Sequence, residues 1–211
     1  MIEARGLSRR FGTVTALHGL GLTVGAGERV ALVGPSGCGK TTALRLIAGL
    51  DIATAGSLVI GGVDATSPRA LPPHRRGLGY VPQGASLFPT MDVAGNVAYG
   101  LSREERSRTG TRVREVLEAF GLAELAERMP HELSGGQARR VALARAMAPA
   151  PRRLLLDEPL VNLDAASCED LLGEIDRALR ASGASLLYVT HDMSEAERLN
   201  ARVVRMEGPG E

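Results

Sequence analysis

Aromatic residues are scarce in this 211-residue sequence: they make up 3% of it, and tryptophan is absent. Proteins that bind single-stranded nucleic acid stack bases on aromatic side chains, so a stacking platform of that kind is not expected. Charge is also nearly balanced, with 25 basic and 24 acidic residues and a formal net charge of +1. The composition therefore gives no support for a nucleic-acid partner.

Cysteine and long apolar segments are scarce as well. Cys38 and Cys168 form no CxxC pattern, and with four scattered histidines they show no zinc-binding spacing, so we expect two reduced thiols. The sequence contains no run of 18 apolar residues and no signal-peptide pattern. These features predict a protein that is made and kept in the cytosol.

Lysine is the rarest charged residue, because 24 of the 25 basic residues are arginine and Lys40 is the one exception. A lysine ammonium is a compact point charge on a flexible stem, whereas an arginine guanidinium is a wide planar fork. A general drift of composition toward arginine explains why lysine is rare. It does not explain why position 40 keeps its ammonium.

The order of the apolar segments predicts a single α/β domain. Residues 1–26 alternate between apolar and polar side chains around glycines, which favours antiparallel strands. Later apolar runs alternate with helical patterns, which is typical of a mainly parallel sheet covered on both faces. Residues 84–133 show helical periodicity and predict a lobe inserted into this core.

The sequence around Lys40 is typical of a loop that binds phosphate. Residues 34–41 read GPSGCGKT and match G-x-x-x-x-G-K-[ST] between a predicted buried strand and a predicted helix, a context that a turn without a ligand does not need. Glycines let backbone N–H groups converge on phosphate, and Lys40 and Thr41 would contact the terminal phosphates and Mg²⁺. The residues expected to bind nucleotide here are Gly34, Pro35, Ser36, Gly37, Cys38, Gly39, Lys40, Thr41 and Thr42.

A second group of residues predicts hydrolytic chemistry. The apolar run 154–156 ends in Asp157, at the edge of a sheet where α/β proteins bind their ligands. Asp157 would hold Mg²⁺ directly or through water, and Glu158 would act as general base for an attacking water. From spacing alone, Glu158 could instead be a plain surface carboxylate.

Residues 133–137, LSGGQ, predict a second helix N-terminus with a small hydroxyl and two glycines, hence a second anion site. Together with the phosphate-binding loop, the Asp157–Glu158 pair and His191 after a later strand, they make the chain resemble the ATP-binding cassette ATPases, the motor subunits of ABC transporters. The resemblance covers nearly the whole sequence. It implies a P-loop NTPase core.

This resemblance also implies a domain organisation. Residues 1–211 form one cassette, in which residues 1–83 and 134–211 make the nucleotide-binding core with its N-terminal antiparallel β subdomain. Residues 84–133 form the helical lobe. The signature motif of the family, residues 134–137 in this sequence, stands at the end of the lobe. Importer ATPases with this kind of lobe sequence often carry a further C-terminal regulatory domain.

The family pattern assigns roles to further residues. Phe11 matches the aromatic that stacks on adenine, Gln83 the glutamine that contacts Mg²⁺, and His191 the histidine that contacts the γ-phosphate. The residues that would bind the ATP of the other protomer are Ser134, Gly135, Gly136, Gln137 and Asp164. The implied catalytic residues are Lys40, Gln83, Glu158 and His191, and the implied Mg²⁺ ligands are Thr41, Gln83 and Asp157. Val161 departs from the pattern, which usually has serine or another small polar residue there.

The function implied by the resemblance is ATP hydrolysis that powers transport. Two such chains, as a homodimer or paired cassettes, would close head to tail around two ATP molecules. A separate integral membrane permease, with a solute-binding protein, would perform import, and the cassette would lie on the cytoplasmic face of the membrane. Contact with the permease is expected around residues 83–100.

Two other classes of protein share some of these motifs. A soluble cassette ATPase of DNA repair or translation would have a long coiled coil between the motifs or two motif sets. Here Lys40 and Ser134 are only 94 positions apart (134 − 40), with one motif set, and the balanced charge disfavours nucleic acid. A small P-loop kinase would have no need of residues 133–137.

Overall fold

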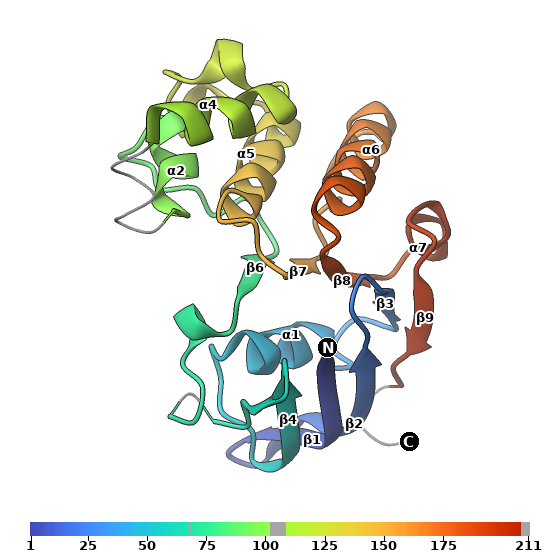
Figure 1. Ribbon diagram of the computed structural model, residues 1–211. Coiled ribbons are helices and arrows are strands. Elements are labelled where there is room, and N and C mark those ends of the chain that lie inside the picture. The colour runs from blue at the N-terminus through green and yellow to red at the C-terminus, as the bar shows by residue number, and fades with distance from the viewer. Residues whose placement is uncertain (68, 102–108, 208–211) are drawn as a thin grey trace.

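The computed structural model describes residues 1–67, 69–101 and 109–207, and its strands form two sheets (Figure 1). The first sheet is antiparallel, in the order β2 (Val14–Val24), β1 (Ile2–Phe11), β4 (Ala55–Ile60) and β5 (Val63–Asp64). The second is parallel, in the order β6 (Leu78–Val81), β7 (Arg153–Asp157), β8 (Ser185–Thr190), β3 (Arg29–Val33) and β9 (Arg202–Arg205). The predicted α/β class, with an N-terminal antiparallel part and a mainly parallel sheet, is confirmed.

Helices cover the parallel sheet and build a lobe above it (Figure 1). The α-helices of the described residues are α1 (Lys40–Ala48), α2 (Val93–Tyr99), α4 (Thr109–Ala119), α5 (Gly135–Met147), α6 (Ala165–Ser182) and α7 (Met193–Arg198). Short 3₁₀ turns occupy Pro73–Arg75, Ala123–Leu125 and Pro130–Glu132. None of the helices in the described part of the chain is long and apolar enough to cross a membrane.

The apolar run in β7 shows why consecutive residues of the parallel strands are hydrophobic. Leu155 belongs to the core cluster that joins α1 to both sheets. Leu154 and Leu156 point to the opposite face and belong to the cluster built with α2, α4, α5 and α6. Successive strand residues point to opposite faces, so a strand covered on both sides needs apolar residues at every position.

The lobe contains α2 and α4, and α5 packs against both of them as well as against α6 and β6. Figure 1 shows α5 beside α6, where the lobe meets the parallel sheet. Helix α5 therefore bridges the two parts of the molecule. The predicted domain boundaries stay a prediction, and residues 102–108 of the expected lobe lie outside the described residues.

A buried arginine joins the loop before β6 to the end of α1. Arg76 is 2% exposed, and its guanidinium donates hydrogen bonds to four backbone carbonyls. The acceptors are Leu71 O (2.9 Å), Leu46 O (3.0 Å), Ile47 O (2.8 Å) and Ala65 O (2.9 Å). Two of these carbonyls belong to the last turn of α1, where the helix dipole favours a cation.

Arg76→Met should lower the free energy of unfolding by about 3–5 kcal/mol, because it leaves buried carbonyls without donors. The measurement is the urea midpoint at an unchanged m-value. Arg75→Met is the matched control, since Arg75 is adjacent and exposed. Equal midpoints for the two variants would show that the buried hydrogen bonds contribute nothing.

Candidate functional site

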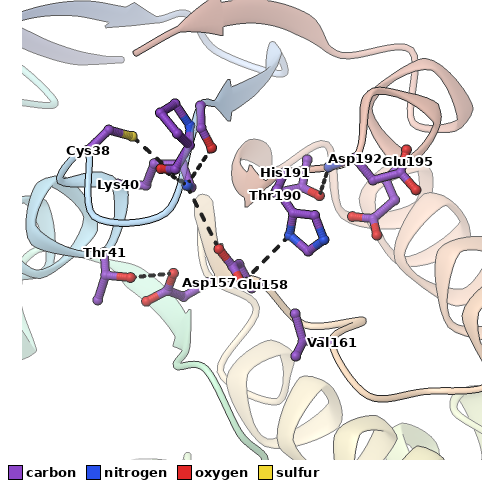
Figure 2. A network of polar contacts seen from close by, with 12 residues as sticks. Cys38, Lys40, Thr41, Asp157, Glu158, Val161, Thr190, His191, Asp192 and Glu195 are labelled. Atoms are coloured by element: carbon purple, nitrogen blue, oxygen red, sulfur yellow. Dashed lines mark hydrogen bonds and ion pairs between the residues drawn. The ribbon is translucent and has the colours of Figure 1, made fainter. Parts of the chain in front are cut away.

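The phosphate-binding loop, residues 34–39, connects β3 to α1, and Lys40 is the first residue of that helix. Lys40 is 5% exposed, and its Nζ donates hydrogen bonds to Gly34 O (2.7 Å) and Pro35 O (2.9 Å). The same Nζ lies 3.9 Å from Glu158 Oε1 (Figure 2). The side chain therefore folds back across its own loop and points its charge at the carboxyl edge of the parallel sheet.

Two positions of the loop require glycine because backbone oxygens of other segments lie very close to them. A Cβ at Gly34 would lie 2.4 Å from Met206 O, and a Cβ at Gly39 would lie 2.4 Å from Ala16 O. Gly39 also has φ +99, a conformation that other residues rarely adopt. The glycines thus let the loop pass between Ala16 of β2 and Met206, which follows β9.

Thr41 and Asp157 form a polar pair 116 positions apart in the sequence. Thr41 Oγ1 donates a hydrogen bond to Asp157 Oδ1 (3.0 Å). Asp157 is buried, and its Oδ2 has no hydrogen-bond partner among the described residues. Burial raises the pKa of Asp157, while the bond from Thr41 opposes that effect. A hydroxyl beside an incompletely satisfied carboxylate fits a hard divalent cation such as Mg²⁺, which binds few protein ligands together with phosphate oxygens.

A cavity of about 450 Å³ brings several of the predicted residues together, whereas Asp157 and His191 do not line it. Its wall combines the phosphate-binding loop and the start of α1 with Gln83, Glu158 and residues 14–16 of β2. The loop, Gln83 and Glu158 come from three separate parts of the chain, so the fold assembles them. Residues 14–16 also line this cavity, although their sequence predicts only a strand and no motif connects them with the loop.

Glu158 stands between Lys40 and His191 (Figure 2). Its Oε2 lies 3.9 Å from His191 Nδ1, and its side chain is 18% exposed. The backbone of Glu158 has φ +44, which is strained for a residue with a side chain, and its amide donates to Val189 O (3.0 Å). The carboxylate is thus held over the end of β7 and faces the cavity, which argues against a plain surface carboxylate.

The signature motif, residues 134–137, does not line this cavity. Ser134 and Gln137 instead cap α5 reciprocally: Gln137 N donates to Ser134 Oγ (3.2 Å) and Ser134 N donates to Gln137 Oε1 (3.0 Å). Asp164 caps α6 by accepting from Ser167 N (3.0 Å). A Cβ at Gly136 would lie 3.2 Å from Ser167 Oγ, so the first turns of α5 and α6 lie close together.

Phe11 lies at the end of β1, outside the cavity lining but beside it. It is 47% exposed and pairs with Val14 of β2, which does line the cavity. Phe11 is therefore not a core aromatic. The guanidinium of Arg9 covers one face of the ring, a contact for which the sequence gives no signal.

Comparisons with known proteins agree with this geometry. The family model of ABC transporters matches residues 17–161. The Fe(3+) ions import ATP-binding protein FbpC of Mesorhizobium japonicum is 45% identical over 207 residues, which are 97% of this chain and 57% of that protein. The sulfate/thiosulfate import ATP-binding protein CysA 2 of Chromobacterium violaceum is 47% identical over 206 residues, 97% of this chain and 56% of that protein. The chain thus spans little more than half the length of these relatives.

A solved structure shows the same fold. It is the dimeric post-hydrolysis state of the ATP-binding cassette MJ0796 bound to ADP and Pi, with a TM-score of 0.84 and 30% identity. The superposition covers 100% of this chain and 97% of that one. The family model covers residues 17–161, more than half of the sequence, and the chain therefore belongs to the ABC transporter family.

Proposed function

We propose that this chain is the ATP-hydrolysing motor subunit of an ABC importer. The observation that carries the proposal is the cavity lined by Lys40, Thr41 and Glu158, together with the hydrogen bond from Thr41 to the buried Asp157. Relatives of this chain are called import ATP-binding proteins for Fe(3+), for sulfate and thiosulfate, and for spermidine and putrescine. Because their cargoes differ in charge and size, the proposal assigns no cargo.

In the proposed reaction, the triphosphate lies against the amides of the loop and Lys40 contacts the terminal phosphates. Thr41, Gln83 and Asp157 would hold Mg²⁺, which when bound neutralises charge on the phosphate oxygens. Glu158 accepts a proton from the water that attacks the γ-phosphorus, and His191 contacts the γ-phosphate from the other side of Glu158. The bond between the γ-phosphorus and the oxygen that bridges it to the β-phosphate breaks, and ADP and inorganic phosphate leave.

The signature motif and Asp164 are proposed to act on a second chain. Both cap helices at adjoining N-termini, where backbone N–H groups and the helix dipole favour an anion, yet neither faces the cavity of its own chain. A head-to-tail homodimer, or a pair of related cassettes, would place them over the γ-phosphate held by the partner. A higher affinity of ATP for the closed pair would drive its closure.

The helical lobe offers a surface for the permease. A cavity of about 680 Å³ lies between α2 and α4. Its lining is mostly small and aliphatic, as at Ala98 and Leu117, and also contains the charged residues Asp92, Arg114 and Glu118. An apolar segment of a membrane permease, associated with a solute-binding protein, would fit this surface and the adjoining residues 83–100. The cassette would then lie on the cytoplasmic face of the membrane as a peripheral subunit.

The test is acceptor-independent phosphate release. The purified chain with ATP and MgCl₂ should release inorganic phosphate in the absence of any other substrate, and chelation of Mg²⁺ by EDTA should stop it. Asp157→Asn should need more MgCl₂ for half-maximal release, because one carboxylate charge is lost. Phosphate transfer that requires an added acceptor would replace the proposal with a kinase.

A further inference from the structure

The tip of the β1–β2 hairpin presents two exposed apolar side chains next to the nucleotide cavity. Phe11 and Val14 are partners in the strand register, and both are among the exposed large hydrophobic residues. Val14 and its neighbours Thr15 and Ala16 form one wall of the cavity that contains Lys40. Phe11 is therefore adjacent to this wall of the cavity, within the region where the base of a bound nucleoside triphosphate would lie.

A fixed cation occupies one face of that ring. The Arg9 guanidinium carbon lies 4.3 Å from the centre of the Phe11 ring. Arg9 Nη1 donates to Ile52 O (2.7 Å), and Nη2 lies 3.2 Å from Asp51 Oδ1. Asp51 is held in turn by Arg45 of α1, whose Nε lies 3.0 Å from Oδ2. The guanidinium is thus anchored to the segment after α1.

We propose that Arg9 is a positioning residue for the nucleotide base, acting through Phe11. A cation over an aromatic face is attracted by the ring quadrupole, so Arg9 holds the ring in one orientation and occupies one face of it. The exposed remainder of the ring then receives the base by stacking. A ring that is held before the ligand arrives loses less side-chain entropy on binding. This inference rests on the proposed function, because it assumes that a nucleotide binds in the cavity.

A structural role is the competing explanation, since the contacts of Arg9 also connect β1 to residues 51–52. The two explanations differ in the part of the ligand that they affect. A positioning role concerns the base alone. A structural role changes the shape of the whole site and affects any triphosphate, including inorganic tripolyphosphate, which has no base.

The experiment compares the binding of ATP with that of tripolyphosphate in three variants and one control variant. Arg9→Met keeps an apolar stem and removes the cation, and it should raise the Kd for ATP about two- to fivefold while leaving the Kd for tripolyphosphate unchanged. Phe11→Ala should raise the Kd for ATP by roughly five- to a hundredfold. In the Phe11→Ala background, Arg9→Met should add nothing, because the ring through which it acts is gone. Arg10→Met, the exposed neighbour with the same charge, is the control and should change neither affinity.

Each contrary result has one meaning. Equal weakening of ATP and tripolyphosphate by Arg9→Met, or the same effect with and without Phe11, overturns the positioning role. Should Arg9→Met not fold, Arg9→Gln removes the cation and keeps a polar side chain. Unchanged ATP binding by folded Arg9→Gln protein, with Phe11→Ala still impaired, would overturn the positioning role. If Lys40→Ala weakens ATP binding but Arg9→Met does not, only this inference fails. If Lys40→Ala has no effect, the proposed function itself fails.

Discussion

Glu158→Gln is expected to bind ATP nearly as well as the wild type and to lose at least about a hundredfold of its turnover. The substituted amide has the same size but cannot accept a proton from the attacking water. Glu158 is positioned for this task, because it faces the cavity with its oxygens 3.9 Å from Lys40 Nζ and from His191 Nδ1. Loss of hydrolysis without loss of binding should trap the ATP-bound dimer.

The measurements for Glu158→Gln are steady-state phosphate release and gel filtration in the presence of ATP and Mg²⁺. Glu127→Gln makes the same chemical change at an exposed position of the lobe and should behave like the wild type. Hydrolysis by Glu158→Gln at the wild-type rate would remove this residue from the catalytic step. It would return the carboxylate to the role of a surface charge.

Lys40→Ala is expected to weaken ATP binding by about 2–3 kcal/mol, which corresponds to roughly a 30- to 160-fold higher Kd. The ammonium is buried in the loop, and its removal leaves the carbonyls of Gly34 and Pro35 without their donor and the phosphates without their cation. Lys40→Arg should also impair hydrolysis, because a planar fork does not fit between two carbonyls that lie 2.7 and 2.9 Å from a single nitrogen.

Titration calorimetry with ATP measures the first effect, and phosphate release measures the second. Arg128→Ala removes one positive charge from an exposed position and controls for the change in net charge. Undiminished ATP affinity in Lys40→Ala would contradict the assignment of the loop. Full activity in Lys40→Arg would show that the site tolerates any cation, so that the survival of one lysine among 24 arginines has no chemical cause.

Sequence patterns predict the strands and loops of this protein whose conformation depends on a few consecutive residues. The run Leu154–Leu156 predicts a strand buried on both faces, and the structure shows the two faces in two different core clusters. The loop around Lys40 also lies between a strand and a helix as its motif requires. In each case a few consecutive residues carry the periodicity or the spacing that determines the conformation.

The remainder depends on contacts between distant residues. Thr41 meets Asp157 only because β7 lies in the same sheet as β3, with β8 between them, and no local pattern specifies this order of strands. Arg76 carries no motif, and its four carbonyl acceptors become a site only after α1 and the loop before β6 have packed. Arg9 is likewise one arginine among 24 until residues 51–52 fix its orientation.

The burial of the only lysine has a further consequence for the behaviour of the chain toward proteases. An endoprotease specific for lysine has one scissile bond in this sequence, between Lys40 and Thr41, and cleavage there divides the chain into segments of 40 and 171 residues. That bond lies in the first turn of α1, directly after the phosphate-binding loop. The rate of cleavage at this bond therefore reports the fraction of molecules in which the phosphate-binding loop has opened. A ligand bound to the loop slows cleavage in proportion to the fraction of molecules that it occupies.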